Sequence, residues 1–113
     1  MSGAGAKFEL LTFEREVAGA PDGTGGRTMS WVTLGLAWAE PRYVRGGERE
    51  AQGVLREINA YRFIVWSAAV AELALTVNDV ILWNGERYNI REMPRRLSGG
   101  PETEILAETG VTL

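Results

Sequence analysis

Side chains that could perform acid–base chemistry are few in this sequence and poorly placed for it. Glu48 and Glu50 flank Arg49, and Glu102 and Glu104 lie two residues apart on a predicted strand. A general acid–base pair needs two carboxyl groups whose environments separate their pKa values. Glutamates among arginines on a predicted solvent face are typical of solvated surface charge instead. We therefore expect no carboxylate catalyst.

The sequence also has few residues that could bind a metal, act as a nucleophile or bind phosphate. The 113 residues include no cysteine and no histidine, which excludes disulfides and cysteine nucleophiles and removes the commonest metal ligand. Asp22 and Asp79 are the only aspartates, and neither fits a Ca²⁺ loop. Glycines 23–26 precede a predicted strand rather than a helix, and Lys7 is the only lysine, so no phosphate-binding loop is indicated. We predict no enzyme and no cofactor.

The net charge argues against nucleic-acid binding, whereas the tryptophan content is compatible with it. The net charge is −3, whereas duplex binding depends on cations that displace counterions. Four tryptophans could stack on single-stranded bases: Trp31, Trp38, Trp66 and Trp83. Their positions within apolar runs favour the hydrophobic core, with an interface role left open for one or two.

The first half of the chain predicts two strands, at residues 8–17 and 28–42. Residues 1–6 are small and predict a flexible arm. Residues 18–27 are rich in glycine and predict a loop, either a simple hairpin connection or an arm that orders on a partner. Gly35 lies inside the second strand and predicts a bulge or a close backbone approach.

The second half predicts a short helix from Glu48 to about Gly53, then a strand from Glu57 to Trp66 that is covered on both faces. Residues 68–75 predict a loop or a single turn. Residues 79–90 predict a hairpin, because Asn84–Gly85 suits a type I′ turn. A basic loop at 91–101 and a strand at 102–111 follow. The pattern indicates a single domain over residues 1–113, mainly β, built as a small antiparallel barrel or sandwich with one short helix and long flexible loops.

Six arginines form two groups in the sequence, Arg42, Arg45 and Arg49 around one turn and Arg91, Arg95 and Arg96 in the late loop. One interpretation is a charged surface paired with nearby glutamates of the same chain. The other is pairing with acidic residues of a neighbouring subunit, since arginine forks suit carboxylates. The sequence favours neither.

The order and spacing of several motifs resemble the phage head–tail joining family of head-closure or stopper proteins, roughly from Phe8 to the C-terminus. The motifs are Trp31 with Trp38–Ala39 seven residues on, Gly47–Glu48 with Ala51, Leu75–Thr76 with Asp79 and Ile81, and Trp83–Asn84–Gly85 with Tyr88 and Ile90. The strand ending at Trp66 lacks the basic residues common in the family, and residues 68–75 exceed its usual connection. These departures suit a divergent member from a prophage or phage-like particle.

The resemblance implies a structural β-barrel protein that forms a homo-oligomeric ring below the portal or adaptor. Such a ring closes the DNA-filled head, lets DNA pass without sequence-specific binding, and docks a tail terminator or tail tube. The protein would be made in the host cytoplasm and reside at the head–tail junction, away from any membrane. We expect loops 18–27 and 91–101 to make the contacts, one toward the channel and one toward a neighbour.

The residues expected at subunit or partner contacts are Asp22, Gly23, Gly25, Gly26, Arg27, Arg42, Arg45, Glu48, Arg49, Arg91, Arg95 and Arg96. The residues expected to define the fold are Trp31, Trp38, Asp79, Trp83, Asn84, Gly85, Tyr88 and Ile90. Two alternatives remain open: another virion ring protein, such as a tail terminator or adaptor, and an OB-like nucleic-acid-binding module.

Overall fold

The computed structural model describes residues 7–21, 23–51 and 54–109. For residues 45–57 it describes the backbone only where those ranges include them, and for the others the side chains as well. Its elements are β1 (Glu9–Pro21), β2 (Arg27–Ala51), β3 (Val54–Trp66), α1 (Ser67–Val70), β4 (Val80–Trp83), β5 (Glu86–Ile90), β6 (Arg95–Arg96), the 3-10 turn η2 (Leu97–Gly99) and β7 (Glu102–Glu108). The predicted arm at residues 1–6 lies outside the described residues.

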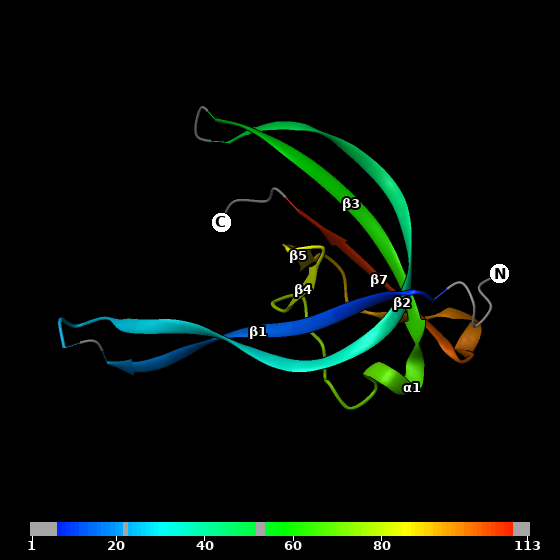
Figure 1. Ribbon diagram of the computed structural model, residues 1–113, viewed down its shortest axis with the longest axis horizontal. Helices are drawn as coiled ribbons and strands as arrows, with labels where there is room; N and C mark the ends of the chain where they lie inside the picture. The colour runs from blue at the N-terminus through cyan, green and yellow to red at the C-terminus, as the bar shows by residue number, and fades with distance from the viewer. Residues whose placement is uncertain (1–6, 22, 52–53, 110–113) are drawn as a thin grey trace.

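All strands belong to one antiparallel sheet in the order β3-β2-β1-β4-β5-β7-β6. β3 pairs with β7 as well as with β2, so the ladder returns on itself around a common interior (Figure 1). The predicted mainly-β class with one short helix is therefore confirmed. None of the described helices is long and apolar enough to cross a membrane.

β2 is shared by two hairpins. Its residues up to Ala39 pair with β1, and its residues from Ala39 onward pair with β3. Figure 1 shows both hairpins extending well beyond the packed body of the molecule. We call the first projection, residues 15–21 and 27–32, the β1–β2 arm, and the second, residues 47–51 and 54–58, the β2–β3 arm.

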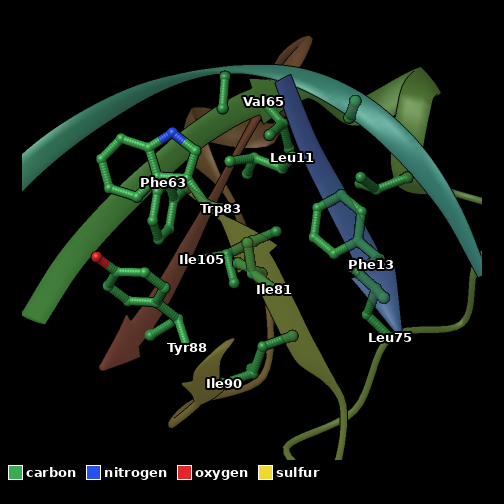
Figure 2. Packing of buried hydrophobic residues seen from close by; sticks show 14 residues of the cluster. Leu11, Phe13, Phe63, Val65, Leu75, Ile81, Trp83, Tyr88, Ile90 and Ile105 are labelled. Atoms are coloured by element: carbon green, nitrogen blue, oxygen red, sulfur yellow. The ribbon is translucent and has the colours of Figure 1, made fainter. Parts of the chain in front are cut away.

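The core fills the space that the strands enclose. Leu11, Phe13, Ile81, Ile90 and Ile105 are fully buried there (Figure 2). Beside them the rings of Tyr61, Phe63, Trp83 and Tyr88 meet mostly edge to face, with centroids 5.1 to 5.8 Å apart. Such edge-to-face packing adds to the stabilisation from burial itself.

Two local sequence signals have the predicted structural effect. Asn84 and Gly85 have φ values of 52° and 77°, as the type I′ turn between β4 and β5 requires. At Gly35 the β1–β2 register shifts, and a Cβ on this residue would lie 2.8 Å from Cδ2 of Leu73. The bulge is confirmed, and the close approach to Gly35 is made by the side chain of Leu73.

The predicted helix from Glu48 to Gly53 is wrong. Residues 48–51 continue β2 and Val54 begins β3, so the segment is the end of a hairpin; Gly53 lies outside the described residues. A helix of about six residues leaves most of its backbone groups unpaired and pays the full cost of nucleation. Continuing the ladder already formed at Tyr43–Tyr61 pairs those groups directly. The one short helix is α1 instead, at the start of the predicted loop or turn.

The predicted loop at 18–27 is also mostly strand. β1 runs to Pro21 and β2 begins at Arg27, so only the turn between them is left as a connection. The glycine content marked the turn, but Ala18 and Pro21 pair with Met29 and Arg27 across the hairpin.

A buried carboxylate joins the β1–β4 side of the sheet to the segment before β4. Asp79 is 1% exposed, and its two oxygens accept hydrogen bonds from Nε (2.7 Å) and Nη2 (2.9 Å) of Arg15. The backbone N–H of Thr76 donates a third hydrogen bond, at 2.8 Å. The Arg15 hydrogen bonds hold the pKa of Asp79 below its ordinary value, against the opposing effect of burial.

Replacing Asp79 by alanine should lower the free energy of unfolding by about 3 kcal/mol, because Arg15 and Thr76 lose a shared buried acceptor. Urea denaturation at pH 7 measures this. Glu72→Gln, at an exposed turn, is the control and should change stability by less than about 0.5 kcal/mol. Equal effects of the two variants would contradict the assigned role of Asp79.

The same site predicts a pH dependence. The pKa of Asp79 is lowered in the folded state. Its contribution to the free energy of unfolding is therefore complete above the unfolded pKa of about 3.9 and is lost as pH falls through the folded pKa. The stability difference between the wild type and Asp79→Asn should therefore narrow below about pH 4. A difference that stays constant down to pH 2 would contradict this.

The β4–β5 turn offers a second stability test. Gly85→Ala should destabilise the protein by about 1 kcal/mol, because an L-residue is strained at positive φ. Apart from its two neighbours in the sequence, no described residue has an atom within 4 Å of the added Cβ, so the cost comes from the backbone alone. Asn84→Gly tolerates positive φ and should stay within about 0.5 kcal/mol of the wild type. Thermal denaturation of both variants provides the comparison.

Candidate assembly interface

The glycine-rich contact residues lie at the tip of the β1–β2 arm. Gly23, Gly25 and Gly26 are exposed in the turn, and Arg27 donates from Nη1 to the carbonyl of Gly19 across the hairpin at 3.3 Å. Asp22 lies outside the described residues. The tip is thus one compact end of a projecting ribbon.

The first arginine group is spread along a strand rather than gathered at a turn. Arg42 is exposed on β2 and pairs with Glu40 at 3.3 Å. Arg45, Glu48 and Arg49 follow on the same strand toward the end of the β2–β3 hairpin. The structure therefore separates these residues along the strand.

The second arginine group pairs with glutamates of β7. Arg91 lies 3.3 Å from Glu108, and Arg95 lies 2.7 Å from Glu104. Arg62 of β3 shares Glu104 at 3.0 Å. These are intrachain ion pairs, although with other glutamates than those nearest in the sequence.

Arg96 differs from its two neighbours. Its Nε donates to the carbonyl of Gly100 at 2.8 Å, and its side chain is exposed beside Met93 and Pro94. Arg96 is one of the residues that line a surface groove.

The tryptophans do not behave alike. Trp83 is buried, and its Nε1 donates to Oε1 of Glu9 at 2.8 Å. Trp66 is half-buried, with Nζ of Lys7 3.8 Å from its ring centroid. Trp31 and Trp38 are exposed on the outer face of the β1–β2 sheet. The preference for core positions is therefore wrong for these two.

Register explains the exposure of Trp31 and Trp38. On β1, Leu11 and Phe13 point into the core, so Leu10 and Trp38, which pair with each other, point outward. The bulge at Gly35 changes the alternation of β2 and returns Trp31 to the outward face. The guanidinium of Arg87 lies 4.5 Å from the Trp31 ring centroid and also pairs with Glu14.

These residues belong to one uncovered apolar surface, which we call the outer stripe: Leu10, Met29, Trp31, Leu36 and Trp38. Met29, Leu36 and Trp38 are 55%, 54% and 53% exposed. Several exposed large apolar side chains on one face mark an interaction site, and tryptophan is enriched at binding hot spots.

A second apolar surface is a groove of about 660 Å³ between α1 and the segment from Met93 to Pro101. Val70, Ala71 and Leu75 line one side and Met93 and Pro94 line the other, with Trp66 and Arg96 also in contact with the space. Its polar members Ser67 and Thr103 hydrogen-bond each other at 2.7 Å. The groove therefore offers mainly apolar contacts.

Acid–base and metal chemistry find little support in the described part of the chain. No group of three or more acidic side chains there is arranged to hold a metal ion. Burial raises the pKa of Tyr88 to about 12, so this tyrosine stays neutral. The low pKa of Asp79 results from its structural ion pair with Arg15. The exposed surfaces suit binding.

Sequence reasoning missed both apolar surfaces. The outer stripe had a signal, because Leu36–Ala37–Trp38–Ala39 alternates large and small residues, but alternation does not say which face is inside. The groove had none, since it forms only when α1 packs near a segment more than 20 residues later.

Comparisons with known proteins agree with the motif resemblance. A family model described as phage head completion protein matches residues 4–110. No curated protein matches the chain.

Two solved structures share the fold. The first is a chain of the virion of native gene transfer agent (GTA) particle, with TM-score 0.71 and 24% identity over 92% of this chain and 94% of that one. The second is the phage-like element PBSX protein xkdH from Bacillus subtilis, with TM-score 0.50 and 14% identity over 88% and 90% of the two chains. With nearly all of its length matched by the family model, the chain belongs to the phage head completion protein family, as a structural component of phage or phage-like particles.

Proposed function

We propose that the chain is a head–tail connector protein that forms a homo-oligomeric ring below the portal or adaptor, closes the DNA-filled head and docks the tail. The observation that carries the proposal is the uncovered apolar outer stripe, in a member of this family whose two arms project from a small core. Monomeric proteins seldom leave several large apolar side chains side by side on one face.

Charge and relatives add support. The net charge of −3 favours the passage of DNA through a ring without retention, since like charges weaken nonspecific binding. A chain of similar fold occurs in the virion of a gene transfer agent. The residues proposed to meet neighbours are those of the β1–β2 arm tip, the arginines of the β2–β3 hairpin and the 91–101 segment.

Deletion of the gene tests the role at the head–tail junction. Electron microscopy of particles from the deleted producer should show tailless heads that leak DNA, beside separately completed tails. Expression of the wild-type chain from a plasmid should restore joined particles. Normal tailed particles from the deleted strain would overturn the proposal.

A DNA titration separates this role from an OB-like binding module. The fluorescence of exposed Trp31 and Trp38 would be quenched if bases stacked on them. The binding of DNA would also weaken steeply between about 50 and 200 mM salt. Glu16 is exposed on the same face, directly across from Trp31, so we expect no quenching by oligothymidine at micromolar concentrations. Salt-sensitive quenching that Trp38→Ala reduces would favour the alternative.

A further inference from the structure

The backbone of the β1–β2 arm is a two-stranded ribbon, and at its base Arg15 pairs with Asp79 and Arg87 lies over the Trp31 ring. β1 pairs with β4 only at Thr12–Glu14, and β2 pairs with β3 only from Ala39 onward. Beyond these contacts, the described residues of the arm form strand pairs only with each other, and residues 27–32 on β2 are all exposed. An isolated two-stranded hairpin is at best marginally stable in water. A partner that covers this ribbon would stabilise it.

The arm and the groove lie at opposite ends of the molecule. In Figure 1 the arm reaches the far left of the longest axis, whereas α1 and the orange segment near residue 95 lie toward the right. The molecule is 51 Å long on this axis. One copy therefore presents the arm at one end and the groove at the other, the arrangement that a head-to-tail contact requires.

The arm and the groove both present apolar side chains. Met29 and Ala18 form an exposed cross-strand pair on the arm, and Met93, 60% exposed, stands at the opening of the groove. Methionine side chains adapt well to irregular apolar gaps. Because Ser67 and Thr103 satisfy each other, the groove favours apolar side chains over a polar ligand.

One pair of opposite charges lies beside the two surfaces. Glu16 is exposed on the arm, directly across from Trp31. Arg96 is exposed at the groove, and the neighbouring Arg95 has a side chain that is 70% exposed. An arginine fork suits a carboxylate that approaches from another copy.

We propose that the β1–β2 arm of one copy docks into the groove between α1 and residues 93–101 of the next copy, with Met29 among the apolar side chains and Glu16 toward Arg96. This inference rests on the proposed ring. A contact between two different surfaces repeats from copy to copy, and it closes into a ring when the rotation between copies is right. A contact of arm with arm would stop at a dimer.

Disulfide crosslinking in assembled particles tests the contact, because the chain has no cysteine of its own. Met29→Cys with Met93→Cys places one thiol on each surface, and Ala18→Cys with Ala71→Cys is an independent pair. After mild oxidation of purified particles, a non-reducing gel should show a ladder of multimers of this chain for at least one pair. The two thiols of one copy lie at opposite ends of the molecule, so each bond must join two copies.

Single variants and a displaced pair are the controls. Met29→Cys or Met93→Cys alone should give no ladder, nor should Met29→Cys with Glu86→Cys, whose second thiol lies in the exposed β4–β5 turn. Dimers of Met29→Cys alone would overturn the proposal in favour of an arm–arm contact. A bond from Met29→Cys to another virion protein would overturn it too.

The outcome also separates this contact from the ring itself. Chains present in particles as a uniform ring, but without a ladder from either pair, would overturn the docking and leave the proposed function intact. Particles that lack the wild-type chain altogether would overturn the proposed function. Met29→Ser should reduce incorporation into particles at least several-fold, whereas Glu86→Ser should not.

Discussion

One constraint organises the molecule: a single strand, β2, serves two hairpins. Its 25 residues would extend roughly 80 Å if straight, at about 3.3 Å per residue, whereas the molecule is 51 Å long. The strand therefore bends. The register of its pairings shifts at three places, opposite Phe13–Glu14, opposite Ala18–Pro21 and between Tyr43 and Arg45. Bulges of this kind bend a strand and increase its twist. The middle of β2 covers the core, and its ends leave the core as arms.

The composition of β2 fits this position. Over the core it contributes Ala37 and Ala39 to the interior, while the large side chains come from β1, β3, β4, β5 and β7. These small inward residues leave the interior to the larger side chains of the other strands. The same alternation sends Leu36 and Trp38 outward, where they stay about half exposed among the described residues. The packing of the core and the exposure of the outer stripe thus follow from one alternating pattern.

Features governed by neighbouring residues could be predicted from the sequence. The turn at Asn84–Gly85, the bulge at Gly35 and the buried strand around Phe63 depend on local backbone preference or on a continuous apolar run. The motif order also led to the family. The helix expected at Glu48–Gly53 failed because helical spacing over so few residues is weaker than a ladder already paired upstream.

The candidate site was only partly predictable for a related reason. The arm tip is marked by its own glycines, so its position was visible in the sequence. The outward face of Trp31 and Trp38 depends on how β1 orients Leu11 and Phe13, and on a bulge that changes the alternation partway along β2. The groove depends on α1 and a distant segment meeting in space. The ion pairs of Arg91 and Arg95 likewise depend on β7 lying beside them rather than on nearby glutamates.

The arm's open edges favour docking through its faces over strand addition. Strand edges that must avoid pairing with other chains commonly carry charges, proline or a bulge. β1 of the arm has Arg15 and Glu16 at its base and Pro21 at its end, and a bulge adjoins it. Proline offers no N–H to a partner strand. The outer face has none of these protections over Met29. Specific contact is therefore expected through apolar side chains of the arm that enter a groove. This mode of contact leaves the strand edges unpaired, so it does not require β pairing between chains.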